Sequence, residues 1–154
     1  MQVPPVPEHR GSQTPPVELL VNIDVDDLDR AIAFYAAAFG LQPARRFGEV
    51  GVEMLGASCP VYLLAKSAGS TPAATTPQQR RDYQRHWTPV HLDFIVPDVA
   101  AAVCRAEAAG ARLEGEIRTH EWGRIAVMAD LFGHGFCLIE FVGRGYDAIA
   151  TGRG

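Results

Sequence analysis

The feature that most constrains this fold is a strand-and-helix pattern that occurs twice in the chain. In the first copy, apolar and polar residues alternate over residues 17–25, which is typical of a strand with one buried face. Asp26 or Asp27 can then cap a helix, and apolar residues recur at helical spacing until Gly40 ends it. A strand followed by an amphipathic helix is therefore predicted for residues 17–40.

The second copy has the same signals in the same order. A strand-like run covers residues 90–96, Asp98 can cap the next helix, and an alanine-rich helical segment ends at Gly110. The capping residues Asp27 and Asp98 are 71 positions apart, and the glycines at the two helix ends are 70 positions apart. An offset that stays constant through strand, cap, helix and stop predicts an internal duplication.

Each helix is followed by three shorter runs with strand character. They cover residues 44–50, 51–55, 61–66, 112–118, 124–130 and 136–142. Each half therefore has the order β-α-β-β-β, and we predict an α+β fold built from two βαβββ modules.

The predicted organisation is one domain over residues 17–146, with a leader before it and a tail after it. Its parts are a proline-rich leader (1–16), module one (17–66), a polar linker (67–86), module two (87–143) and a tail (147–154). The leader contains five prolines and is expected to be extended or mobile. We expect the linker arginines, Arg80, Arg81 and Arg85, to face solvent; a lid over a pocket is the alternative.

Charge and composition exclude several classes of partner. The formal net charge of -4 provides no basic field for a phosphate backbone, so nucleic acid is not expected. No apolar run approaches the roughly 20 residues that span a bilayer, so no membrane is expected either. The three cysteines, Cys59, Cys104 and Cys137, are widely spaced without a CxxC pair, which favours a reducing cytoplasm.

Strand parity predicts a polar cavity on one side of the sheet. If the apolar residues of the first strand face its helix, Asn22 and Asp24 face the other way, and His91 and Asp93 do so in the second copy. Polar groups at strand centres are costly to bury without partners, so water or a ligand is expected on that face.

Two motifs carry a resemblance to a known family. They are the run Asp-Leu-Asp-Arg-Ala-Ile-Ala-Phe-Tyr over residues 27–35 and the turn Asp-Leu-Phe-Gly-His over residues 130–134. With the paired βαβββ units, the chain resembles the glyoxalase/bleomycin-resistance/dioxygenase group, the vicinal oxygen chelate superfamily. It departs from that group at Leu131, where proline is usual. The resemblance implies a curved mixed sheet around a cleft, helices outside, and a homodimer.

The resemblance also implies four positions at which metal-dependent members hold their ligands. In this chain these positions carry Leu20, Tyr62, His91 and Cys137. A catalytic metal normally needs three good donors, and only His91 is a plausible ligand, so we predict no metal and no other cofactor; a divalent metal is the alternative. Glu140 does not complete the set, because its parity directs it away from the cleft.

Other residues have a functional and a structural interpretation. His91 and Asp93 can form an acid–base pair or simply line a pocket. Trp122 can stack on a flat ligand and Arg124 can pair with a carboxylate or phosphate, or both can pack at an edge. Cys137 is expected to be a small buried hydrophobic residue, and His134 to lie on the surface in a structural turn.

We therefore expect a metal-independent protein that binds a small aromatic or amphipathic molecule. The predicted ligand-binding residues are Leu20, Asn22, Tyr62, His91, Asp93, Trp122, Arg124 and Cys137. The alternative is a lyase, isomerase or dioxygenase that uses His91, either bound to a metal or as an acid–base group with Asp93. A purely structural or partner-binding module is the third class, and it would have a cleft filled by side chains.

Overall fold

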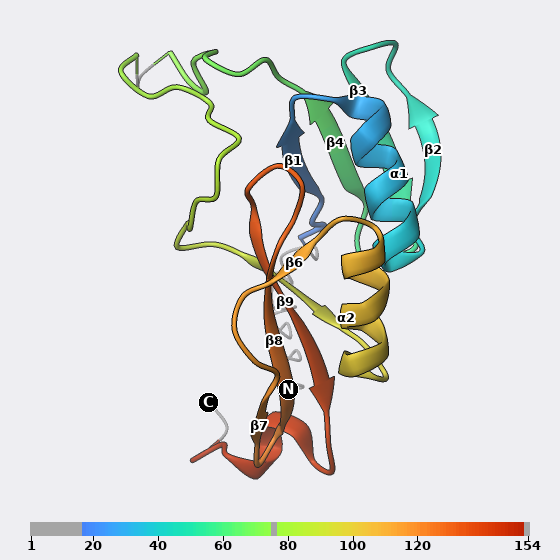
Figure 1. Cartoon of the computed structure of the whole chain (residues 1–154), viewed down its shortest axis with the longest axis vertical. Helices are drawn as coiled ribbons and strands as arrows, with labels where there is room; N and C mark the ends of the chain where they lie inside the picture. Colours follow the sequence, from blue (N-terminus) through green and yellow to red (C-terminus); the bar gives the residue numbers. More distant parts are fainter. Residues whose placement is uncertain (1–16, 75–76, 153–154) are drawn as a thin grey trace, which may run out of the picture.

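A computed structural model describes residues 17–74 and 77–152, and the predicted leader lies outside this range. Figure 1 shows two modules stacked along the long axis of the molecule, each made of a sheet and one helix, with the two helices on the same side. Within the described residues, neither helix is long and apolar enough to cross a membrane. The predicted α+β class with two βαβββ modules is confirmed.

Module one has the predicted element order. It contains β1 (Val21–Val25), α1 (Leu28–Phe39), β2 (Gln42–Arg46), β3 (Gly51–Leu55) and β4 (Val61–Ala65). The strands form a mixed sheet in the order β1-β4-β3-β2, in which β1 and β4 are parallel and the other pairs antiparallel.

Module two repeats this topology with one extra strand. It contains β5 (Leu92–Ile95), α2 (Val99–Ala108), β6 (Arg112–Leu113), β7 (Arg118–His120), β8 (Gly123–Ala129) and β9 (Gly135–Phe141), and a 3-10 turn, η1 (Gly145–Ala148), follows. The order is β5-β9-β8-β6, with β5 and β9 parallel and β7 paired to β8. Because the parallel pair recurs at the same place, the structure supports the duplication inferred from the constant offset.

The helix caps confirm the residues chosen from the sequence. The Asp27 side chain accepts a hydrogen bond from the Arg30 amide at 3.0 Å, and the Asp98 side chain accepts one from the Ala101 amide at 2.9 Å. Gly40 ends α1 with a φ of 70°, a left-handed conformation that glycine adopts without strain. These signals are local, which is why the sequence alone was sufficient to place them.

Four predicted strand ranges differ from the structure by more than one residue. The run predicted at residues 44–50 is β2 at Gln42–Arg46. The first strand begins at Val21 instead of residue 17, since its partner β4 is preceded by Pro60, which has no amide hydrogen to continue the ladder. Leu20 therefore precedes the strand and is 50% exposed. Likewise β5 begins one residue after His91. The run at 112–118 divides into β6 and β7.

Aromatic packing joins the two modules. Phe39 at the end of α1 stacks on Phe94 of β5, with ring centroids 4.0 Å apart, and meets Phe136 of β9 edge to face at 5.4 Å. Buried apolar residues of both modules form one continuous hydrophobic cluster. The modules therefore share a core and are not independent domains joined by a linker.

A buried hydrogen bond connects the same two modules. The Tyr35 hydroxyl of α1 donates to Oδ2 of Asp130, in the turn before β9, at 2.7 Å. Oδ1 of Asp130 accepts the amides of Phe132 and His134 at 2.8 and 2.9 Å. Burial raises the pKa of the Tyr35 phenol well above its ordinary value, and the Asp130 charge raises it further, so the hydroxyl remains a donor.

Replacing Tyr35 by Phe should lower the free energy of unfolding by about 2 kcal/mol, because a buried carboxylate oxygen loses its hydrogen-bond donor. Urea unfolding followed by circular dichroism measures this change. Tyr146→Phe is the matched control, since this tyrosine is 49% exposed, and it should change stability by less than about 0.5 kcal/mol. Equal effects of the two substitutions would contradict a special role of the Tyr35–Asp130 bond.

Candidate functional site

One cavity lies where the two modules meet, between β1 and the β5–β9 pair, and we call it the seam pocket. Its volume is about 500 Å³. It is lined by Val21, Asn22, Ile23, Asp24, Tyr35, His86, Thr88, Val90, His91, Leu92, Phe94, His134, Gly135 and Phe136. The lining combines apolar and aromatic side chains with polar ones, three of them histidines, and a concave surface of this kind can hold a small molecule.

His91 reaches the seam pocket from the residue just before β5. Its ring packs on Trp87 with centroids 4.7 Å apart, and the Arg85 guanidinium lies 5.7 Å from the Trp87 ring. Asn22, from β1 of module one, lines the same pocket. Strand parity had assigned Asn22 and His91 to one cavity. The structure brings these two residues together, although they are 69 positions apart in the sequence.

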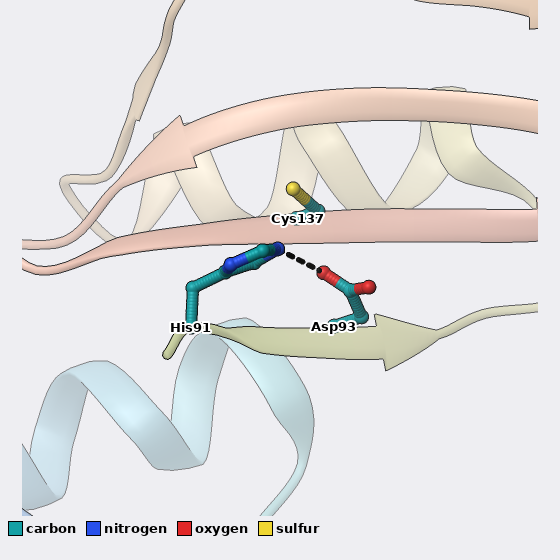
Figure 2. A group of neighbouring side chains, drawn as sticks. All are labelled: His91, Asp93 and Cys137. Carbon is teal, nitrogen blue, oxygen red and sulfur yellow. Dashed lines mark ion pairs between the residues drawn. The ribbon is translucent and has the colours of Figure 1, made fainter. Parts of the chain in front are cut away.

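A second feature of His91 is a group of three possible metal donors on the sheet of module two, shown in Figure 2. His91 Nε2 lies 3.2 Å from Asp93 Oδ1, and the donor atoms of His91, Asp93 and Cys137 all lie within 4.8 Å of one another. The parallel register pairs Asp93 directly with Cys137. From the sequence we had assigned Asp93 a role as an acid–base group or as a residue that lines the pocket, but not as a metal ligand. The shared strand parity of Asp93 and His91 had already placed both on the same face of the sheet.

The Cys137 thiol is poorly prepared to act as a ligand or nucleophile. It is buried, and burial raises its pKa to about 11, with a further contribution from the neighbouring Asp93 charge. The predicted small buried residue at this position is therefore confirmed. A metal ion at this group would first have to displace the thiol proton.

A separate polar cluster occupies the sheet of module one. Glu53 on β3 accepts hydrogen bonds from Arg45 at 2.9 and 2.6 Å and from the Tyr62 hydroxyl at 2.8 Å, and Arg45 also donates to Tyr62 at 2.8 Å. The Arg45 guanidinium, together with Tyr62, holds the pKa of Glu53 down at about 2. The direction of Glu53 could not be chosen from the sequence, because the register of β3 is decided by its pairing with β4.

This cluster lines a second cavity of about 680 Å³, formed by Glu18, Leu19, Leu20, Arg45, Glu53, Ser58, Cys59, Pro60 and Tyr62. Leu20 and Tyr62, two of the four positions implied by the family resemblance, are therefore together here. The other two, His91 and Cys137, are together on module two. On module one, Arg45 is already paired with Glu53 and Tyr62. Of these two groups, the one on module two therefore offers several metal donors without an arginine partner.

Trp122 and Arg124 are not among the residues that line the seam pocket. Trp122 stacks on His120 with ring centroids 5.0 Å apart, and Arg124 lies 3.4 Å from Glu140. Glu140 in turn accepts the Val99 amide at the start of α2 at 2.8 Å, which confirms that its side chain points away from His91 and Cys137. A ligand-binding role for Trp122 and Arg124 stays a prediction.

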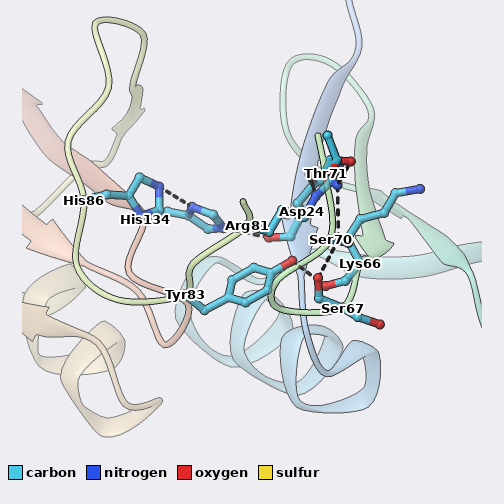
Figure 3. Close-up of polar contacts among 9 residues, drawn as sticks. All are labelled: Asp24, Lys66, Ser67, Ser70, Thr71, Arg81, Tyr83, His86 and His134. Carbon is cyan, nitrogen blue, oxygen red and sulfur yellow. Dashed lines mark hydrogen bonds and ion pairs between the residues drawn. The ribbon is translucent and has the colours of Figure 1, made fainter. Parts of the chain in front are cut away.

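Two linker arginines and one turn histidine differ from expectation. Arg81 pairs with Asp24 at 2.7 Å and is only 14% exposed, and Arg85 binds both oxygens of Glu114 at 2.7 Å. His134 is partly buried, with its ring between His86 and the Asp24 carbonyl (Figure 3). Solvated arginines and a surface histidine were wrong predictions, because their partners are distant in sequence.

Comparison with known proteins matches residues 20–139 to a family model described as a glyoxalase-like domain. A curated relative, the "Anthracycline biosynthesis protein DnrV" of Streptomyces peucetius, is 33% identical over 134 residues, which cover 86% of this chain and 44% of that protein. The chain therefore spans less than half the length of this relative.

Solved structures support the same fold. The fosfomycin resistance protein FosX of Listeria monocytogenes superposes with a TM-score of 0.62 at 18% identity, covering 82% of this chain and 94% of that one. A glyoxalase/bleomycin resistance protein/dioxygenase family enzyme of Burkholderia phytofirmans PsJN gives 0.62 at 22% identity, covering 80% and 97%. At these identities the likeness concerns the fold alone.

The raised pKa of Cys137 predicts slow alkylation. A shift of the pKa from 9.0 to about 11 reduces the fraction of thiolate at pH 8 about a hundredfold. Cys137 in a Cys59→Ser, Cys104→Ser background should therefore react with iodoacetamide far more slowly than Cys104 does when it is the single remaining cysteine. Asp93→Asn should accelerate the reaction several-fold, whereas the distant Asp29→Asn should not. Mass spectrometry follows the rate; no acceleration by Asp93→Asn would exclude its electrostatic influence.

Proposed function

We propose that this chain, which belongs to the glyoxalase-like domain family, binds a small flat aromatic molecule in the seam pocket without a metal ion. The observation that carries the proposal is the seam pocket itself, about 500 Å³ in volume and within the range of drug-sized ligand sites. Phe94, Phe136 and Tyr35 supply aromatic surface, while Asn22 and His91 supply hydrogen-bonding groups for the edge of a ring.

The distribution of donors supports binding without a metal. Leu20 offers no donor atom, and Tyr62 belongs to the cluster in which Arg45 already neutralises Glu53. On module two the high pKa of Cys137 favours the protonated thiol. Of the four positions implied by the family, the one at His91 is thus the one whose side chain can bind a metal ion without first losing a proton or another partner.

The class of ligand draws support from the curated relative. Its name places it in anthracycline biosynthesis, and anthracyclines are flat, fused-ring aromatics with carbonyl and hydroxyl groups at their edges. Such a ligand would match an aromatic wall bordered by an amide and an imidazole. Since the chain spans less than half of the relative, the ligand class is part of the proposal and not a property transferred from it.

Binding is tested by titrating the protein with an anthracycline and following the ligand's own fluorescence. Val21→Trp should raise the dissociation constant at least about tenfold, because the larger side chain enters the seam pocket where Val21 lines it. Val50→Trp is the matched control, since Val50 is 65% exposed and lies outside the pocket. Unchanged affinity of the Val21 variant would place the ligand elsewhere, and no binding by the wild type would contradict this ligand class.

A second candidate function is favoured by the His91, Asp93 and Cys137 group. Three donors with an open position are what a catalytic metal site requires, and a divalent ion there would polarise a carbonyl group of a substrate. The protein would then be an enzyme of the lyase, isomerase or dioxygenase type. Without a metal, the His91–Asp93 pair at 3.2 Å would instead serve as the acid–base group.

Metal content separates the two candidates. After dialysis against buffer with added zinc or manganese, elemental analysis should find no stoichiometric ion under the first proposal. About one ion per chain would contradict it and support the second, provided that Asp93→Asn and Cys137→Ser each abolish retention. Cys104→Ser is the control, because Cys104 is exposed and lies outside the donor group.

A homodimer and a cytoplasmic location belong to the same proposal. Support for a second copy comes from large apolar residues that are exposed near the ends of both sheets, among them Val90 and Ile95 of module two. The free cysteines of the chain are compatible with a reducing compartment.

A further inference from the structure

A short strap borders the seam pocket and contributes His86 to its lining. The strap, residues 81–87, leads into module two and crosses the turn before β9, where the His86 amide donates to the Gly133 carbonyl at 3.0 Å. A Cβ atom at Gly133 would lie 2.0 Å from the Gln84 carbonyl oxygen, so the strap lies directly against this turn. At its start, Arg81 is tied to Asp24 of β1. The strap therefore contacts both modules (Figure 3).

Two histidine rings form a chain of hydrogen bonds across this contact. His86 Nδ1 lies 3.0 Å from the Gln84 carbonyl oxygen, and His134 Nε2 lies 2.7 Å from the Asp24 carbonyl oxygen. The inner nitrogens, His86 Nε2 and His134 Nδ1, are 3.0 Å apart. The chain thus begins and ends at a backbone carbonyl, and both rings line the seam pocket.

The two backbone carbonyls determine which ring nitrogens carry a hydrogen. A carbonyl oxygen can only accept, so the outer nitrogen of each ring must carry a hydrogen. A neutral imidazole has one hydrogen, which leaves both inner nitrogens as acceptors facing each other. A hydrogen bond between them requires one additional proton, so the pair is complete only when one ring is an imidazolium.

The charged and titratable groups around the pair are compatible with one extra proton. They are Asp24 and Asp26 at the end of β1, Arg81, Tyr83 and Arg85 in the strap, Glu114 beside the strap, Asp130 in the turn, Tyr35 and Arg30 on α1, and His91 across the pocket. Asp24 is paired with Arg81, and Arg85 with Glu114. Asp130, in the same turn, accepts the backbone amide of His134.

We propose that His86 and His134 form a one-proton binding site that holds the strap closed, and that loss of this proton opens the border of the seam pocket at the strap. The proton site stands on the hydrogen-bond geometry alone. Its consequence for the ligand rests on the proposed function: affinity in the seam pocket should fall as the pH rises. The sign holds above roughly pH 6.5, where free histidines are mostly neutral: closure then takes up one proton, so a lower pH favours the closed strap.

The proton site is tested on the full chain without any ligand. The protection factor of the residue 86 amide against hydrogen exchange reports strap closure, because this amide is bonded to Gly133. It should decrease by up to about tenfold per pH unit above roughly pH 6.5, because free histidines are mostly neutral there and closure takes up one proton. Nitrogen-15 spectra of the histidine rings should show an imidazolium at the lower end of this range.

Two substitutions distinguish a proton site from simple packing. In His86→Gln the side-chain amide can donate to the inner nitrogen of neutral His134, so closure should become independent of pH. His86→Ala should lower the protection of the residue 86 amide and remove its pH dependence. His120→Gln, outside the strap and stacked on Trp122, is the control and should behave as the wild type.

Each outcome decides the proposal. A wild-type protection factor that does not change with pH, or a His86→Gln variant that keeps the wild-type slope, would overturn the proton site. If closure follows pH but anthracycline affinity does not, the regulation of the pocket is refuted and the proton site is retained. If no anthracycline binds at any pH, the proposed ligand class fails while the exchange data still decide the proton site.

Discussion

The buried carboxylate of Asp130 is the interaction on which the arrangement of the two modules depends. One oxygen accepts the Tyr35 hydroxyl of module one, and the other accepts two amides of its own turn. A buried carboxylate is costly unless its oxygens are satisfied, so the turn, α1 and β9 must adopt compatible positions. That condition places His134 beside Asp24, where both residues line the seam pocket.

The chemistry of the site follows from this arrangement. Each module carries its own polar group, Arg45–Glu53–Tyr62 on module one and His91–Asp93–Cys137 on module two. The first is internally neutralised, and the second contains a thiol held in its protonated form by burial. The space between the modules combines aromatic and apolar side chains with histidines and other polar groups, an environment suited to recognising a ligand by ring stacking and by hydrogen bonds at its edge.

Local signals accounted for most of the fold. Asp27 and Asp98 could be identified as caps because a capping bond spans only three residues, and Gly40 as a stop because of its conformational freedom. Strand parity also placed Asn22 and His91 in one cavity. The ends of β1 and the orientation of Glu53 were not accessible, since strand ends and register depend on the partner strand.

The sequence by itself determined the duplicated βαβββ order, the helix limits and the residues that face away from the helices, since each of these depends on neighbours a few positions apart. Only the tertiary structure decided that Asp93 and Cys137 join His91, that the strap arginines are paired, and that His86 and His134 meet between two carbonyls. The physical reason is distance along the chain: the His134 contacts join residues 48 and 110 positions apart, and such contacts exist only after the modules have packed.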